Sequence, residues 1–235
     1  MFTPGETLQL LWTIKPNNDA YPYTLFAYRI NNQTGVKTYL PGGTQEATDI
    51  FGNNAQAGFR LTRLPEAAKQ VLIGPGGLFP ANLGQIPNEL GMHTLVVQIR
   101  DFTGTRVVKS AYFKIGVVDG FENLQGNVNA DRTLVNTKAY RLSGLVFVRN
   151  STLTIQPGTF IIGQPGSQPP SALVITQTGK IMARGTRSRP IVMTSSQPFG
   201  QRKAGDWGGL ILLGRAPTNW PTGFGNIEGL TASEE

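Results

Sequence analysis

The chain is 235 residues long, with 39% hydrophobic and 15% charged residues, so it can bury a substantial core and is not a disordered tail. The absence of cysteine excludes disulfides, thiolate metal sites and a cysteine nucleophile. The net charge of +7 suits nucleic acid, an anionic polysaccharide or an acidic membrane surface, but no block of five or more Lys and Arg occurs, so scattered basic residues on a soluble protein are the simpler interpretation.

The first half of the chain has the pattern of short β-strands separated by turns. The 29 glycines and 16 prolines demand many turns, which favours an all-β fold over helices. Strands are predicted within Thr7–Pro16, Tyr23–Ile30 and Ala57–Leu64. Asn31–Gly35 is typical of a hairpin turn, and residues 65–70 could form one helical turn.

The clearest hairpin is MHTLVVQIRDFTGTRVVKSAYFKIGVV, at Met92–Val118. His93, Leu95 and Val97 alternate on one face of its first strand. In the turn at Asp101–Gly104, the aspartate can cap the backbone and the glycine can adopt a positive φ. His93 is the only histidine, and its position predicts a half-buried strand residue rather than a metal ligand or a catalytic base.

Six or seven such strands within about 110 residues fit an immunoglobulin-like β-sandwich. The stretch Gly91–Gly104 resembles the last strands of Ig-like domains of bacterial surface proteins, which often read G-x-(H/Y)-T-L-x-V-x-(V/I)-x-D-x-x-G. The composition then shifts toward Asn and Asp in residues 118–140, which places a boundary at about residue 120. We therefore expect an Ig-like domain over residues 1–119 and a second domain over residues 120–235.

The second half of the chain contains an internal repeat. GLVFVRNSTLTIQPGT at Gly144–Thr159 and SALVITQTGKIMARGT at Ser171–Thr186 share one pattern of two short strands, a polar turn and a final Gly-Thr. A third, degenerate copy begins at Trp207–Asn219. At an offset of 27 residues, Val148 aligns with Ile175, Ile155 with Met182, Gly158 with Gly185, and Thr159 with Thr186. Such a period predicts a β-solenoid in which each copy is one coil.

Stacked coils bury ladders of like residues, and alternation along each strand indicates which residues point inward. The expected inward pairs are Val146 and Val148, then Leu173 and Ile175, then Ile211 and Leu213. A second wall is expected to hold Leu153 and Ile155, followed by Ile181 or Met182. Loops at Gln164–Pro170 and Gln197–Gly205 are expected to project outward.

This half resembles a family of secreted or cell-surface bacterial parallel β-helix proteins. Their coils read much like "LTI-(E/Q)-PG-T-x-I-x-G…SALIV-x-x-G-x-I-x-A-x-G-T-x-x-x-PI-V-(F/M)-T-S…G-x-WGG-L-I-x-LG-x-A-P", which this chain matches over about Gly126 to Gly229. The resemblance implies a right-handed parallel β-helix of the pectate-lyase-like superfamily fold, here with three to four coils. Most such proteins are of unknown function and usually have more coils, so a truncated or processed piece is one expectation.

Polysaccharide-cleaving enzymes with this fold use clustered or paired carboxylates on successive coils, often with Ca²⁺. The acidic residues from Gly126 onward are Asp131, Asp206, Glu228, Glu234 and Glu235. No two of them occupy equivalent coil positions. We therefore predict no catalytic residue, and an enzyme is the less favoured interpretation.

Two groups of residues are candidates for binding a ligand or partner. The first is a basic patch in two adjacent loops: Arg184, Arg187, Arg189, Arg202 and Lys203. It could bind an anionic polymer or an acidic partner, or it could be a solvated loop surface. The second comprises Trp207 and Trp220, where an aromatic ring beside Asp206 could hold sugar. The alternative is that Asp206 caps its turn and Trp207 packs at a coil corner.

A structural Ca²⁺ at the predicted domain junction is a further hypothesis, with Asp101, Asp119 and Glu122 as ligands. No other cofactor is expected.

Two functions remain open. The preferred one is a non-enzymatic extracellular or envelope protein, with a structural, adhesive or accessory role, that docks onto a larger assembly of protein subunits. The alternative is a carbohydrate-binding or polysaccharide-processing protein, with an anionic polysaccharide as partner. No nucleic acid is expected, and no apolar run of 18 residues is present that could span a membrane. The expected location is the cell surface, the periplasm or the extracellular space, with a leader peptide not present in this chain.

Overall fold

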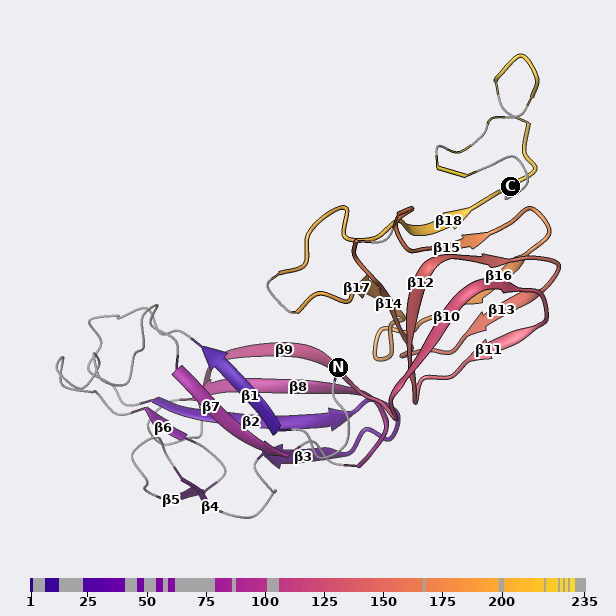
Figure 1. The fold of residues 1–235 in the computed structure, drawn as a ribbon. Coiled ribbons are helices and arrows are strands. Elements are labelled where there is room, and N and C mark those ends of the chain that lie inside the picture. The colour runs from indigo at the N-terminus through magenta and orange to yellow at the C-terminus, as the bar shows by residue number, and fades with distance from the viewer. Residues whose placement is uncertain are drawn as a thin grey trace. The chain divides into compact units, whose positions relative to one another are not determined.

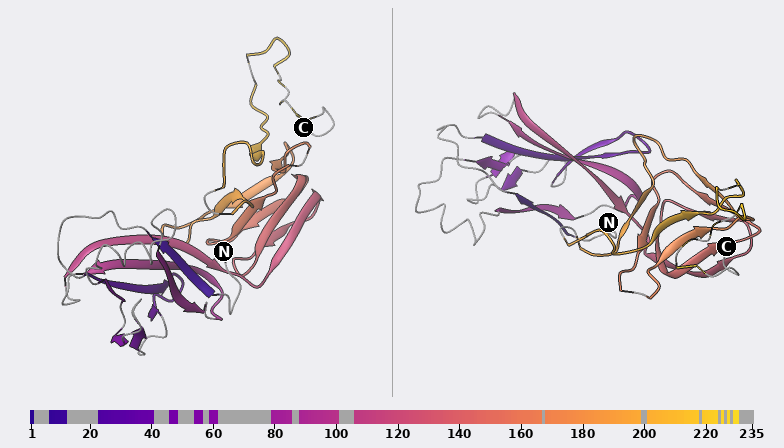
Figure 2. Two further views of the ribbon diagram at one scale, coloured as in Figure 1. Left: turned by 60° about the vertical axis from the view of Figure 1, so that its left-hand side comes forward. Right: turned by 90° about the horizontal axis from the view of Figure 1, so that it is seen from above.

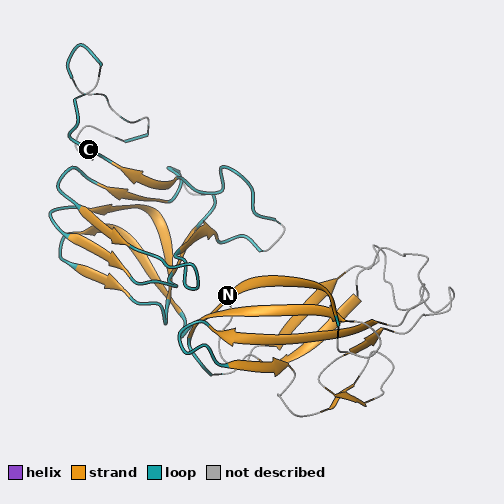
Figure 3. Cartoon of the chain, turned by 180° about the vertical axis from the view of Figure 1, so that it is seen from behind, coloured by secondary structure: helices purple, strands orange, loops and turns teal. Residues whose placement is uncertain are grey.

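The computed structural model separates into two compact units, Met1–Val117 and Val118–Glu235 (Figure 1). The regular elements of the described residues are all strands, as Figure 3 shows, and none of those residues forms a helix suited to crossing a membrane. The described residues are 1, 7–12, 23–40, 46–48, 54–56, 59–61, 79–85, 88–100, 106–166, 168–198, 201–217, 219–223, 225, 227, 229 and 230.

The first unit is built from antiparallel strands. Its main sheet has the order β3-β2-β8-β9, with β6 also pairing with β2. Two smaller pairs are β1 with β7 and β4 with β5. The bounds are β1 Thr7–Trp12, β2 Tyr23–Asn31, β3 Lys37–Leu40, β4 Glu46–Thr48, β5 Asn54–Gln56, β6 Phe59–Leu61, β7 Phe79–Gln85, β8 Gly91–Arg100 and β9 Val107–Val117.

The predicted hairpin is confirmed, because β8 and β9 pair along nearly their whole length, with Gly91 opposite Val117. Its turn at residues 101–104 and the helical turn expected at 65–70 lie outside the described residues. Of the strand expected at Ala57–Leu64, the described residues Phe59–Leu61 do form a strand. The immunoglobulin-like topology stays a prediction.

His93 is more deeply buried than predicted, and it belongs to a polar network within the main sheet. The guanidinium of Arg29, itself buried, contacts Nδ1 of His93 at 3.2 Å and donates to both carboxylate oxygens of Glu89, at 2.9 and 3.2 Å. Because arginine can only donate, Nδ1 must accept, so Nε2–H donates to the backbone carbonyl of Glu89 at 2.9 Å. His93 is therefore a neutral structural residue in this arrangement.

Acid is expected to destabilise the first unit in two stages. Burial lowers the pKa of His93, because the imidazolium would lose its hydration. The unfolded chain therefore binds a proton more readily, and stability present above about pH 6.5 falls as the pH drops from there toward the folded pKa. Hydrogen bonds from Arg29 and Asn31 lower the pKa of Glu89 from 4.5 to about 2, so its contribution is lost as the pH falls through that second range.

The first stage is tested by thermal unfolding at several pH values, with hydrogen exchange of strands β2 and β8 as the readout. We expect the stability of the wild type to fall below about pH 6.5, and that of His93→Gln to fall less steeply there. A wild-type stability that is constant between about pH 7.5 and 5.5 would contradict a buried neutral His93.

The second unit is a stack of coils with three parallel walls. The strands are β10 Phe121–Val128, β11 Arg132–Leu134, β12 Ala139–Val148, β13 Thr152–Ile155, β14 Phe160–Gly163, β15 Ala172–Ile175, β16 Lys180–Ala183, β17 Val192–Ser195 and β18 Gly209–Leu212. One wall stacks the first halves of β10 and β12, then β14 and β17. The next wall stacks their second halves, then β15 and β18. The third wall holds β11, β13 and β16 (Figure 1).

Two walls are joined directly in the first two coils and separated by loops in the later ones. Strands β10 and β12 run through the corner, and Gly126 and Gly144 take φ values of +64° and +66° there, which glycine adopts without steric cost. In the third coil, residues 164–171 are inserted at this corner, and in the fourth coil residues 196–208 are inserted. The fourth coil has no strand in the third wall among the described residues.

The interior of the stack is a continuous apolar core, and Val148 lies directly opposite Ile175 as predicted. Tyr140 is buried in this core, with its hydroxyl accepting a hydrogen bond from the Val135 N–H at 2.8 Å. One corner repeats the same backbone bond in each coil. The pairs are Arg149 N–H to Val128 O, Thr176 N–H to Val148 O and Leu213 N–H to Ile175 O, at 3.1, 3.1 and 2.9 Å. The buried interior residues are Leu124, Val128, Leu134, Tyr140, Leu142, Val146, Val148, Leu153, Ile155, Ile161, Leu173 and Ile175.

The offset of 27 residues holds only for the pairing of β12 with β15. Ile155 pairs with Ala183, not Met182, because the turn before β16 has one residue more than the turn before β13. The connection from β16 to β17 is also longer than the connection from β13 to β14. Phe160, which follows Thr159, therefore pairs with Val192. The predicted alignments of Thr159 with Thr186 and of Gly158 with Gly185 are wrong. Ile181, one of the two expected candidates, does lie over Leu153.

The third inward pair was also predicted one residue out of phase. Leu210 and Leu212 pair with Leu173 and Ile175, so they continue the interior ladders. Ile211 and Leu213 instead pack on the other side of the sheet, against a small cluster around Val174. Because side chains alternate with a period of two, a shift of one residue exchanges the two faces of the strand.

Candidate docking surface at the open end of the coil stack

The two ends of the coil stack differ in how their interior residues are covered. In the first coil, Leu124, Val128 and Leu134 are buried. In the fourth coil, Leu210 is 38% exposed and Leu212 is 61% exposed. We call the surface formed by Met193, Leu210 and Leu212 the open end, because these residues continue interior ladders but have no rung above them among the described residues.

The strands at the open end also present unpaired edges. β17 pairs with β14, β18 pairs with β15 and β16 pairs with β13, and no described strand pairs with their other edges. Figure 2, in its left-hand view, shows the chain leaving β18 as an irregular segment and not as another rung. An edge strand leaves half of its backbone N–H and C=O groups facing away from the sheet, so this surface can accept a further strand.

Basic residues are concentrated in the segment that forms the last coil. Residues 180–215 contain seven basic residues and one acidic residue, so they carry +6 of the +7 net charge of the chain. The acidic residue, Asp206, is buried. We call the basic residues the basic rim, which comprises Lys180, Arg184, Arg187, Arg189, Arg202, Lys203 and Arg215.

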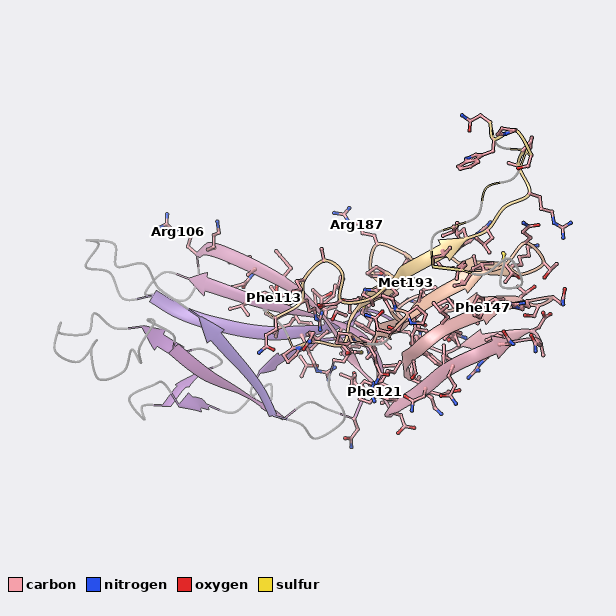
Figure 4. All side chains as sticks on the ribbon, turned by 45° about the horizontal axis from the view of Figure 1, so that its top comes forward. Arg106, Phe113, Phe121, Phe147, Arg187 and Met193 are labelled. Carbon is pink, nitrogen blue, oxygen red and sulfur yellow. The ribbon has the colours of Figure 1, made fainter. Side chains whose placement is uncertain are left out.

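The five basic residues predicted to form a patch lie on the connections of the last coil. Arg184 and Arg187 are exposed and Arg189 is half-buried, all in the connection that leads into β17. Figure 4 shows Arg187 projecting away from the ribbon. Arg202 and Lys203 are exposed in the connection that leaves β17. The Arg202 guanidinium donates to Gln197 O at 2.9 Å and to Thr194 Oγ1 at 3.3 Å, which holds that connection against the strand.

Asp206 and Trp207 are built into the fold of the last coil. The carboxylate of Asp206 accepts a hydrogen bond from the Lys203 N–H at 3.1 Å, which closes the turn. Its pKa is lowered, first by a hydrogen bond from Ser195 and then by the one from Lys203. Trp207 is half-buried, and its ring packs against the interior core and over Gly163. Trp220 lies beyond β18 and is 65% exposed. Binding of a ligand by Trp207 or Trp220 stays a prediction.

The packing of Trp207 on Gly163 leads to a testable coupling. A Cβ at Gly163 would lie 2.5 Å from three side-chain atoms of Trp207, so Gly163→Ala is expected to destabilise the second unit by about 1–3 kcal/mol. Trp207→Gly removes those atoms, so the further cost of Gly163→Ala should nearly vanish in that background. Hydrogen exchange of β14 and β15 in the wild type, the two single variants and the double variant measures this coupling. Additive losses of stability in the double variant would contradict the contact between Trp207 and Gly163.

The described residues contain no group of three or more His, Cys, Asp or Glu that could hold a metal ion. Of the proposed Ca²⁺ ligands, Asp119 is exposed, and Glu122 forms an ion pair with Arg132. Asp101 lies outside the described residues. The Ca²⁺ site therefore stays a prediction with its third ligand undescribed.

Sequence reasoning missed the exposure of Leu210 and Leu212 and the place of Lys180 and Arg215 in the basic rim. The charge signal was present, because a count over residues 180–215 isolates nearly all of the net charge. The exposure carried no such signal, because GLILL reads like any buried rung of the stack.

The stacked parallel strands around one apolar core define the second unit as a short parallel β-helix. In agreement, residues 119–233 match a family model described as a pectate-lyase like beta helix domain. Comparison with curated proteins and with solved structures found no match.

Proposed function

We propose that this chain is a non-enzymatic structural or accessory subunit, located at the cell surface or in the envelope, that docks onto a larger protein assembly through the open end of its β-helix. The N-terminal unit, as an Ig-like domain, and the right-handed winding of the helix belong to the same proposal. The observation that carries it is the exposure of Leu212 directly above the buried Ile175.

The physical support is that two interior ladders continue into side chains that are exposed in the described structure. Leu210 and Leu212 have the residue type and direction of core residues, and the strand that carries them has an unpaired edge. Covering them would bury apolar surface and satisfy backbone groups at the same time, which is how β-strand addition gains affinity. The described part of the second unit holds no group of three or more His, Cys, Asp or Glu such as a Ca²⁺-dependent polysaccharide lyase would need, which supports docking over that kind of cleavage.

Isolation of the native complex tests the proposal. We expect wild-type chain to co-purify with defined protein subunits, and Leu210→Ser/Leu212→Ser to lose them while its coil stack stays folded. Val36→Ser is the matched control, because Val36 is 55% exposed but lies in the first unit. An unchanged complex with the double variant would contradict docking at the open end.

Carbohydrate binding is the second candidate, and the exposure of Trp220 favours it. An exposed indole can stack on a sugar ring, and the exposed Arg215 on the same segment after β18 can contact acidic groups. On a glycan array, Trp220→Ala should abolish a wild-type signal, with Trp207→Ala as the second variant. No signal on any glycan would reject this candidate.

A further inference from the structure

We propose that one face of the main sheet of the first unit binds a carboxylated polysaccharide, with Tyr112 as the stacking platform and Lys37 and Lys114 as the contacts for the carboxylates. The inference goes beyond the function proposed above, because it concerns the first unit alone.

The pairing of strands β3, β2, β8 and β9 places these residues on one face of the sheet. Opposite residues of paired strands point to the same side, and so does every second residue along a strand. Tyr28 lies opposite Val96, and Val96 lies opposite Tyr112. The next row, two residues along each strand, begins with Lys37 on β3 and ends with Lys114 on β9. The surface that we call the tyrosine face consists of Tyr28, Lys37, Thr94, Val96, Tyr112 and Lys114.

The tyrosine face is accessible at its margins and filled in the middle. Tyr112 is 67% exposed, and Lys37 and Lys114 are exposed as well. Tyr28 is half-buried, and Val96, which lies between the two tyrosines in their row, is fully buried. A tyrosine combines an apolar ring with a polar tip, so an exposed one can stack on a sugar ring and hydrogen-bond to its hydroxyls. The face therefore offers an accessible aromatic platform beside two cations.

Both lysines lean over the sheet, so their charges have defined positions. The Lys37 ammonium lies 3.9 Å from the centre of the Tyr28 ring on the neighbouring strand. The Lys114 ammonium donates to Thr94 Oγ1 at 2.7 Å, and that hydroxyl donates to Asn32 Oδ1 at 2.8 Å. Tyr28 and Thr94 are diagonal neighbours on β2 and β8, about 7–8 Å apart. One ligand can therefore reach both ammonium groups.

The charge of the sheet favours an anion. Glu89, which precedes β8, pairs with Arg29, whose side chain points to the other face. Burial lowers the pKa of Lys114, because its ammonium loses part of its hydration, and a carboxylate would replace that hydration. An anionic ligand is therefore attracted to this sheet. Strands β2, β3, β8 and β9 contain no Asp or Glu and five basic residues, which are Arg29, Lys37, Arg100, Lys109 and Lys114.

The neutral groups on the same face favour a polysaccharide over other anions. Gln98 and Ser110 lie opposite each other in a further row, and the Gln98 amide donates to Ser110 Oγ at 3.5 Å. Two cations among hydroxyl and amide groups suit a ligand with many hydroxyls and spaced carboxylates. A nucleic acid carries a phosphate at every nucleotide and calls for a more continuous basic surface. An acidic peptide would add to a strand edge or fill apolar pockets, and the tyrosine face is neither.

The test uses the full chain and soluble oligosaccharides, with binding measured by titration calorimetry. The carboxylated probes are oligosaccharides of hyaluronan, in which carboxylated and neutral sugars alternate, and of alginate. The comparison probes are a neutral chitin oligosaccharide and single-stranded oligodeoxythymidylate. We expect at least one carboxylated probe to bind, and both comparison probes to bind at least roughly tenfold more weakly.

Matched variants on strand β9 test the face directly. Tyr112→Ala should weaken the carboxylated probe by roughly tenfold or more. Phe113→Ala is its control, because Phe113 is 43% exposed but points to the other face. Lys114→Met should weaken binding and reduce its salt dependence, and Lys109→Met, an exposed lysine on the other face, should change neither. Thermal melting of each variant shows that the first unit stays folded.

The other outcomes each overturn the inference. If oligodeoxythymidylate binds as tightly as the carboxylated probes, the face is a general polyanion surface. If the chitin probe binds equally well, the lysines have no role in recognition. If Tyr112→Ala has no effect and Trp220→Ala abolishes binding, the carbohydrate site lies in the second unit. If no carboxylated probe binds at about 1 mM, the tyrosine face is not a polysaccharide site, and docking through the second unit is unaffected by that result.

Discussion

Replacing Leu173 with alanine is expected to lower the free energy of unfolding of the second unit by about 2–5 kcal/mol, because a fully buried leucine loses its contacts and leaves a cavity. The same substitution at Leu210, the next rung of the same ladder, should cost about 1 kcal/mol or less, because its side chain is partly in water already. The two positions share residue type, wall and side-chain direction. The difference between the two losses of unfolding free energy therefore measures the effect of having a further strand over the leucine.

Hydrogen exchange in peptides from β12 and β15 is the suitable measurement, since the chain has two units and one global transition cannot be assigned to either. Equal losses at Leu173 and Leu210 would mean that the open end is covered in solution. That result would remove the basis of the docking proposal.

Gly179→Ala is expected to be the most disruptive glycine substitution in the stack, with a loss of roughly 3 kcal/mol or more. Gly179 ends the turn before β16, and a Cβ there would overlap the backbone carbonyl of Val148 in the coil below. A side chain could rotate away from such a contact, but this carbonyl accepts the Thr176 N–H and the Thr176 hydroxyl, which fix its position.

Gly214→Ala is the control for this substitution. Gly214 also follows a strand corner, but the nearest atom to an added Cβ is 4.0 Å away. We expect a change of less than about 1 kcal/mol, of either sign. Thermal melting together with hydrogen exchange of β13 and β16 would show whether the turn has opened, and a well-folded Gly179→Ala protein would refute the close contact of the two coils.

The stability of the coil stack matters for the proposed docking because it keeps strand β18 rigid. A stack held by repeated corner bonds and close turns presents β18 as a fixed edge, and a preformed edge loses little entropy when a strand adds to it. Loss of the ladder at Leu173 should therefore weaken docking as well as stability. Loss at Leu212 should weaken docking alone.

Much of the architecture of this protein could be predicted from its residues. The repeat predicted stacked coils and the contact between Val148 and Ile175, because like residues must superpose to bury a continuous core. The alternation and turn of Met92–Val118 predicted the antiparallel pairing of β8 and β9. The turn capped by Asp206 and the packing of Trp207 against the core, which the sequence offered as one alternative, are both present, and sugar binding by Trp207 stays a prediction.

The candidate site could be predicted only in part. The basic residues Arg184, Arg187, Arg189, Arg202 and Lys203 were predicted as charges in two connections of one coil, and the exposed leucines Leu210 and Leu212 of the same coil were not predicted. His93 was expected to be half-buried, yet its network with Arg29 and Glu89 joins residues about 60 positions apart. No local pattern encodes such a pairing.

The sequence by itself determined the all-β class, the stacking of coils in the second unit, and the inward direction of Val148 and Ile175, because these follow from local alternation and repetition. Only the tertiary structure decided the register beyond the pairing of β12 with β15, because the connections differ in length: one extra residue precedes β16, and longer insertions precede β17 and β18. It also decided which inward-facing leucines lack a cover. Burial depends on the neighbouring coil and not on the residue itself, so Leu173 and Leu210 look alike in the sequence and differ only in the fold.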